Sequence, residues 1–130
     1  MKYEYHEDGT LPVEPYIFVF GSNLGGRHGA GAARVAFEQY GARSRQGVGL
    51  QGHSYAIPTK NSMLEVLDLY VIDGYIKEFL KFAEGSSDRF WITTVGCGLA
   101  GYAYVQIAPM FKGAPSNCNF PKIWRYYLEK

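Results

Sequence analysis

The chain has 130 residues, with 13 lysines and arginines against 12 aspartates and glutamates, so its net charge is +1. This balance gives no overall field toward nucleic acid or an anionic membrane. Apolar residues make up 47% of the chain and glycine fills 16 positions without the bias of a disordered linker, which excludes a disordered or collagen-like chain and predicts one domain, residues 1–130, with a packed core.

The first half of the chain alternates between apolar runs and glycine-rich turns. Residues 1–15 contain two prolines and predict an irregular N-terminal arm that holds at most a short edge strand. Residues 16–20 (YIFVF) are continuously apolar, which is typical of a strand buried on both faces. The apolar spacing of residues 32–40 predicts a helix, for which Gly41 provides a stop.

The middle of the chain predicts a second strand and a long helix. We expect a loop over residues 43–52 and a strand over residues 53–57, which Pro58 would end. Ser62 and Glu65 have the spacing of a capping box, which predicts that a helix begins there. The apolar face of this helix is formed by Leu69, Ile72, Ile76, Phe79 and Ala83.

The last third predicts a third strand over residues 90–95 and a further helix over about residues 104–112, disturbed by Pro109. Residues 116–130 predict a short strand or a helical turn. Because strands and helices alternate along the chain, we expect an α/β fold in three layers with a mixed, largely parallel sheet.

Two glycine clusters lie where this fold would bind a ligand. Residues 29–31 (GAG) and 96–101 (GCGLAG) each follow a predicted strand and precede a helix. Such a loop presents free N–H groups and the positive end of a helix dipole, which together attract anions. Two of them at the carboxyl edge of one sheet predict a cleft for a ligand with two phosphates. The alternative is a pair of tight turns that bind nothing.

Three segments together resemble a macro domain: residues 23–33 (NLGGRHGAGAA), 55–60 (YAIPTK) and 95–102 (VGCGLAGY). They look most similar to the glycohydrolase branch that removes terminal ADP-ribose from acidic side chains of proteins, and short macro-like proteins of phages look similar too. The resemblance covers roughly residues 16–112. It implies a macro-like α/β/α fold whose cleft binds ADP-ribose or a related NAD-derived nucleotide.

The resemblance also assigns the residues that would bind this nucleotide. Asn23 would contact the distal ribose, although its amide could instead hold the turn. Tyr102 would stack on the adenine or pack in the core, and Cys97 could be a stabilised thiolate or an inert thiol. The full set that the resemblance places at the ligand is Asn23, Gly29, Ala30, Gly31, Gly96, Cys97, Gly98, Leu99, Ala100, Gly101 and Tyr102.

The catalytic residues of the glycohydrolase branch are matched only in part. Lys60 falls where that branch has its nucleophilic lysine, but Ala100 stands where the branch has an assisting aspartate. His28 replaces a methionine of the branch and is a candidate general acid or base, a phosphate contact or a solvated side chain. Asp8 or Glu14 would have to replace the aspartate that holds the adenine amine in macro domains.

The sequence therefore predicts a nucleotide-binding protein, with hydrolysis of ADP-ribosyl bonds as the enzymatic hypothesis. The alternative is a non-catalytic module that binds or sequesters a nucleotide. Its partner would be a free nucleotide or an ADP-ribosylated macromolecule. We expect no cofactor, no metal site and no membrane partner, since the histidines lie far apart and no apolar run could span a bilayer. Two cysteines, Cys97 and Cys118, and a start without a signal peptide predict free thiols in the cytoplasm.

Overall fold

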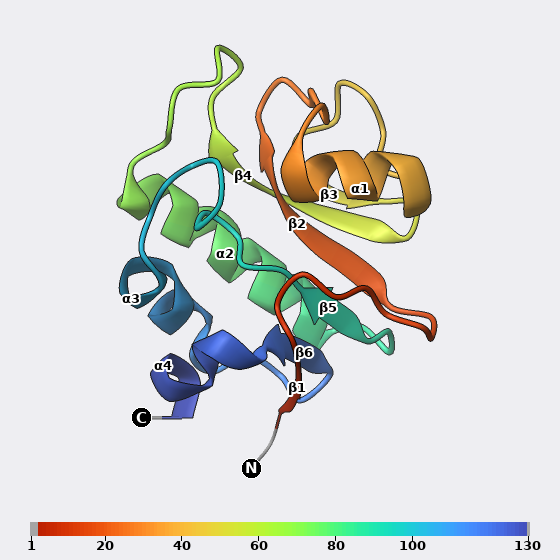
Figure 1. Ribbon diagram of the computed structural model, residues 1–130, viewed down its shortest axis with the longest axis vertical. Helices are drawn as coiled ribbons and strands as arrows, with labels where there is room; N and C mark the ends of the chain where they lie inside the picture. The colour runs from red at the N-terminus through yellow and green to blue at the C-terminus, as the bar shows by residue number, and fades with distance from the viewer. Residues whose placement is uncertain (1–2, 130) are drawn as a thin grey trace.

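The computed structural model describes residues 3–129 (Figure 1). Six strands form a sheet in the order β1-β6-β5-β2-β4-β3, and four neighbouring pairs are parallel while β3 and β4 are antiparallel. The sheet is thus mixed and mostly parallel, and the α/β expectation is confirmed. The strands are β1 (Glu4–His6), β2 (Ile17–Asn23), β3 (Gly49–Gln51), β4 (Ser54–Lys60), β5 (Phe90–Ile92) and β6 (Cys118–Pro121).

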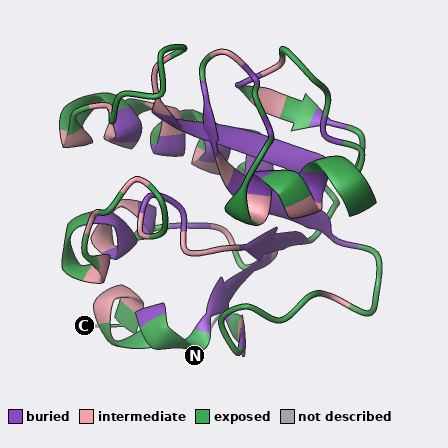
Figure 2. Cartoon of the chain, turned by 45° about the horizontal axis from the view of Figure 1, so that its top comes forward, coloured by how far each residue is buried: buried purple, intermediate pink, exposed green. Residues whose placement is uncertain are grey.

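Helices cover both faces of this sheet. Alternate side chains of β2 point in opposite directions, so that Phe18 packs on one side and Val19 on the other. Figure 2 shows the central strands buried and the helices exposed on their outer sides. No helix within residues 3–129 is long and apolar enough to cross a membrane. The helical segments are α1 (Gly31–Gln39), α2 (Leu69–Glu84), α3 (Tyr104–Ile107), η1 (Ala108–Phe111), η2 (Lys122–Trp124) and α4 (Arg125–Glu129).

Each face has its own apolar core. On one face α1 packs through Ala33 and Ala36 against the aromatic side chains of Phe18, Phe20 and Trp91. On the other face α2 and the C-terminal helical segments bury a larger cluster. Burial of these side chains supplies the main driving force for folding and holds the carboxyl ends of β2, β4 and β5 in place.

The second predicted strand is longer than expected. β4 continues through Pro58 to Lys60, and the predicted end at Pro58 is wrong. β3 pairs with only three residues of β4, from Ser54 to Ala56. Beyond Ala56 one side of β4 therefore has no partner strand in the sheet, and a residue without an N–H is tolerated there. The predicted loop over residues 43–52 contains the edge strand β3, which is too short to have a recognisable pattern.

The predicted capping box is also wrong. α2 begins at Leu69, after Asp68, and not near Ser62. The side chain of Asn61 accepts the N–H groups of Met63 and Glu65, both at 2.9 Å, which closes a short turn there instead. Asn61 thus takes the N–H of Glu65 that a capping Ser62 would have taken.

The remaining differences lie near the ends of the elements. β5 ends at Ile92 rather than residue 95, because the chain then turns into the second glycine cluster. The helix expected over residues 104–112 is divided into α3 and η1, with Pro109 in the first turn of η1. The N-terminal arm contributes the edge strand β1, and residues 1–2 of the arm lie outside the described residues.

One glycine of α2 provides a test of this fold. Gly74 lies in the middle of α2 on its exposed side, and a Cβ there would meet no atom within 4 Å. We expect Gly74→Ala to raise the free energy of unfolding by roughly 0.5–1 kcal/mol, because alanine loses less backbone entropy in a helix. Equilibrium urea unfolding measures this change.

Gly26→Ala is the contrasting substitution, at a glycine that the fold requires. Gly26 has φ of +68°, and its Cβ would collide with the backbone of Arg45 and Gln46. This variant should unfold more easily than the wild type. A Gly74→Ala variant that is less stable than the wild type would contradict the placement of Gly74 on the open side of α2.

Candidate functional site

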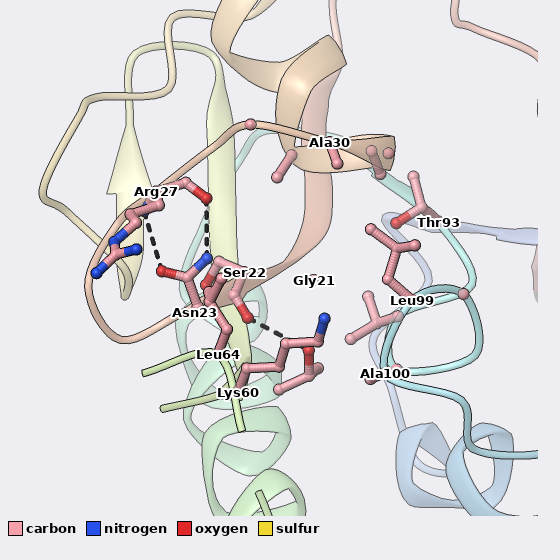
Figure 3. A pocket seen from close by; sticks show the side chains of 18 of the residues that line it. Gly21, Ser22, Asn23, Arg27, Ala30, Lys60, Leu64, Thr93, Leu99 and Ala100 are labelled. Atoms are coloured by element: carbon pink, nitrogen blue, oxygen red, sulfur yellow. Dashed lines mark hydrogen bonds between the residues drawn. The ribbon is translucent and has the colours of Figure 1, made fainter. Parts of the chain in front are cut away.

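A cleft of about 620 Å³ lies at the carboxyl ends of β2, β4 and β5 (Figure 3). The start of α1 forms one wall and the loop of residues 95–101 forms another. Its volume is within the usual range for sites that bind small molecules. The cleft is lined by Gly21, Ser22, Asn23, Arg27, Gly29, Ala30, Gly31, Ala32, Ala33, Thr59, Lys60, Leu64, Thr93, Thr94, Val95, Gly96, Gly98, Leu99 and Ala100.

The first wall carries the uncapped N-terminus of α1. Ala30 is its N-cap residue and has no side-chain oxygen to accept a hydrogen bond. Within residues 3–129 no acceptor takes the N–H groups of Gly31, Ala32 and Ala33. These donors and the positive end of the helix dipole therefore remain available at the cleft wall.

The facing loop also carries free N–H groups. It is closed by hydrogen bonds from Cys97 to Thr94, from Gly101 to Gly98 and from Tyr102 to Gly96, each at 3.0 Å. These bonds leave three other backbone N–H groups of the loop without an acceptor in the described part of the chain. They belong to Gly98, Leu99 and Ala100, which also line the cleft.

The charged side chains of the cleft are both cationic. Arg27 and Lys60 line it, and no aspartate or glutamate does so among the described residues. Neither cation takes part in an ion pair within residues 3–129. In Figure 3 the ammonium group of Lys60 points toward the middle of the cleft, whereas the guanidinium of Arg27 points away. The cleft is therefore suited electrostatically to an anion.

At two positions of the cleft no steric contact within the described residues requires a glycine. A Cβ on Gly29 or Gly98 would meet no atom within 4 Å, and neither residue has a φ in the left-handed region. Both residues line the cleft. The missing side chains therefore leave room for a ligand to approach the backbone closely.

Asn23 lines the cleft and also holds the adjoining loop. Its Nδ2 donates to the carbonyl of Arg27 at 2.8 Å, and its Oδ1 accepts the N–H of Arg27 at 3.0 Å. The structure therefore shows the turn-holding role that was the alternative for this residue. The asparagine is 7% exposed, and a ligand contact of its amide stays a prediction.

His28 does not line the cleft. Its Nε2 donates to the carbonyls of Arg43 at 2.9 Å and Gln46 at 3.1 Å, and its ring packs edge-on against Phe20. The buried Nδ1 has no partner in the described chain. In this position His28 connects the loop of residues 24–29 to the loop of residues 42–47. Its imidazole does not reach the cleft.

Three further residues that the resemblance assigned to the ligand do not line the cleft. Cys97 packs against the core beneath the loop, and burial, with a smaller effect of the Asp8 charge, raises the pKa of its thiol to about 12. The hydroxyl of Tyr102 donates to the carbonyl of Leu67 at 2.7 Å. Gly101 has φ of +86° and turns the chain toward α3.

The sequence interpretation missed several residues of the cleft. Thr93 and Thr94 follow β5 directly, and Thr59 precedes Lys60. The Thr93 hydroxyl donates to the carbonyl of Val19 at 2.7 Å. The pair of threonines after the FWI strand was a usable signal, because polar residues at the carboxyl end of a buried strand often face a ligand. Leu64 had no comparable signal.

A second cavity of about 250 Å³ adjoins the cleft, since Ala32, Thr93 and Thr94 line both. In its wall the ring of His6 stacks on Trp91 with 3.8 Å between centroids, and Nδ1 of His6 is hydrogen-bonded to Asn119. The cavity is further lined by Asp8, Gly9, Thr10, Leu11, Phe18 and Val35.

Comparison with known proteins adds no assignment. No family model, curated protein sequence or solved structure matches the chain. Within residues 3–129 no group of three or more histidine, cysteine, aspartate or glutamate side chains is placed to hold a metal ion. Both cysteines are free.

The thiol of Cys97 provides a pH test of the site geometry. At pH 8 a pKa of about 12 leaves its thiolate fraction on the order of 10³-fold below that of an ordinary cysteine. Alkylation of Cys97 in the folded protein should thus be slow at pH 8 and still rise about tenfold per pH unit up to pH 10. Peptide mass spectrometry after iodoacetamide pulses measures the rate, with the urea-unfolded chain as control. A rate that levels off below pH 9 would contradict the raised pKa of this half-buried thiol.

Proposed function

We propose that the cleft binds ADP-ribose or a closely related NAD-derived nucleotide without hydrolysing it. The observation that carries this proposal is the pair of facing walls with free N–H groups, one from α1 and one from the loop of residues 95–101. Two such groups of donors fit the two phosphates of a nucleoside diphosphate. The ammonium group of Lys60, which points into the cleft where no described carboxylate lines the wall, adds favourable charge.

The second cavity supports a nucleotide rather than a smaller anion. It adjoins the cleft at Thr93 and Thr94 and is walled by the stacked rings of His6 and Trp91. A partly aromatic cavity that also carries polar side chains, next to a phosphate site, suits a nucleobase. The resemblance to macro domains adds that the base would be adenine, and Asp8 in this cavity would accept its amine.

The residues of the cleft favour binding over hydrolysis. Cleavage of a glycosidic bond needs a nucleophile or a base, and a group that assists the departure of the leaving group. Ala100 stands where the glycohydrolase branch has aspartate, and His28 is buried outside the cleft. Among the described side chains this leaves Lys60 without an acidic or imidazole partner.

A calorimetric titration tests the binding site. We expect ADP-ribose to bind the wild type and Gly98→Glu to weaken binding at least about 100-fold, since the added carboxylate would occupy the phosphate position. The matched control is Gly74→Glu, whose Cβ also meets no atom within 4 Å but which lies on α2, outside the cleft. This control should bind as the wild type does. Equal binding by both variants, or no binding by the wild type, would refute the proposed site.

Turnover separates a binding protein from an enzyme. We expect a protein that carries glutamate-linked ADP-ribose to lose none of it above the background rate when incubated with the wild-type chain. Lys60→Ala should lower the affinity for free ADP-ribose about tenfold, because it removes the cation that points into the cleft. Release of ADP-ribose by the wild type that Lys60→Ala abolishes would instead establish Lys60 as a catalytic residue.

A further inference from the structure

The chain after β4 forms a short hairpin at the Lys60 end of the cleft. Lys60 pairs with Val66 in an antiparallel bridge, and Leu67 donates its N–H to the carbonyl of Thr59 at 2.9 Å. Asn61 organises the turn between them: its Nδ2 donates to the Glu65 carboxylate at 2.8 Å, and its backbone N–H donates to the Glu65 carbonyl at 2.8 Å. The hairpin is therefore held in one conformation before any ligand arrives.

Leu64 occupies the strained position of this hairpin. Its N–H donates to the carbonyl of Asn61 at 3.0 Å, and its φ is +66°. A residue in the left-handed region after such a turn is usually glycine, because a Cβ is unfavourable there. Among the described non-glycine residues, only Leu64 and Arg45 have a positive φ. A bulky apolar side chain is thus held at a backbone conformation that favours a residue without a side chain.

Packing does not compensate for this strain. The Leu64 side chain is 45% exposed and belongs to neither apolar core. It lines the cleft instead. Strained backbone that the surrounding fold maintains without a packing benefit is characteristic of functional sites.

A second leucine lies on the other side of the cleft. Leu99 is 70% exposed, also lies outside both cores, and its Cδ1 is 3.6 Å from the position that a Cβ of Gly31 would take. Figure 3 shows Leu64 and Leu99 on opposite sides of the Lys60 ammonium group. This end of the cleft therefore combines one cation with two apolar walls.

We propose that Leu64 is a specificity-determining residue that selects nucleotides whose diphosphate carries a second sugar over those that end at the β-phosphate. This inference rests on the proposed function. The C–H face of a furanose packs favourably against leucine, while Lys60 neutralises the adjoining phosphate. A nucleotide that ends at the β-phosphate would keep its phosphate contacts but gain nothing from the two apolar side chains.

Titrations of ADP-ribose and ADP into the same variants test this inference. The wild type should prefer ADP-ribose by roughly tenfold, and Leu64→Gly should bring the two affinities to within about twofold of each other by weakening ADP-ribose alone. Leu64→Gly should unfold at no lower urea concentration than the wild type, since glycine relieves the strain. Asparagine also tolerates the left-handed region, so Leu64→Asn should lose the preference without the added backbone freedom of glycine. Loss of the preference in both variants would show that a loosened loop is not its cause.

Met63→Gly is the matched control, because Met63 lies in the same turn, is 77% exposed and does not line the cleft. It should keep the wild-type preference. Equal weakening of ADP and ADP-ribose in Leu64→Gly, or an unchanged preference, would overturn the inference while leaving the proposed function intact. A wild-type chain that binds neither nucleotide overturns both.

Discussion

The site depends on backbone N–H groups that find no acceptor within residues 3–129 and lie at the carboxyl edge of the sheet. β2, β4 and β5 are parallel and end together, and buried apolar side chains on both faces fix where they end. The chain leaves β2 toward α1 and β5 toward the loop of residues 95–101. Because Ala30 cannot cap α1, polar groups of the backbone stay open to whatever enters the cleft.

The loops around these donors are held rigidly by bonds within the protein. Asn23 closes the loop after β2, and His28 ties that loop to its neighbour through two carbonyls. Gly26 and Gly47 permit this close packing, since a Cβ on either would collide with backbone of the facing loop. The glycines of these loops therefore serve two separate purposes: Gly26 and Gly47 let loops pack together, whereas Gly29 and Gly98 keep the cleft open.

The sequence was most informative where one local pattern decided the structure. The buried strand at residues 16–20 and the glycine clusters depend on neighbouring residues alone, and most of the predicted ligand residues line the cleft. Distant contacts decided the rest. β6 forms because it pairs with β5 and with β1, a strand more than 100 residues earlier in the chain. His28 turns away from the cleft because the carbonyls of residues 43 and 46 accept hydrogen bonds from its Nε2, and no spacing in the sequence reveals that.

An NMR titration of the ¹⁵N-labelled protein with ADP-ribose tests the central claim most directly, because it reports on the open backbone amides themselves. The amide signals of Gly31, Ala32 and Ala33 on one wall and of Gly98, Leu99 and Ala100 on the other should shift together and saturate at one ligand per chain. Hydrogen bonding to phosphate should move the bonded amide protons downfield. Signals of both walls that stay unchanged at saturating ligand, or shifts confined to residues outside the cleft, would contradict the account.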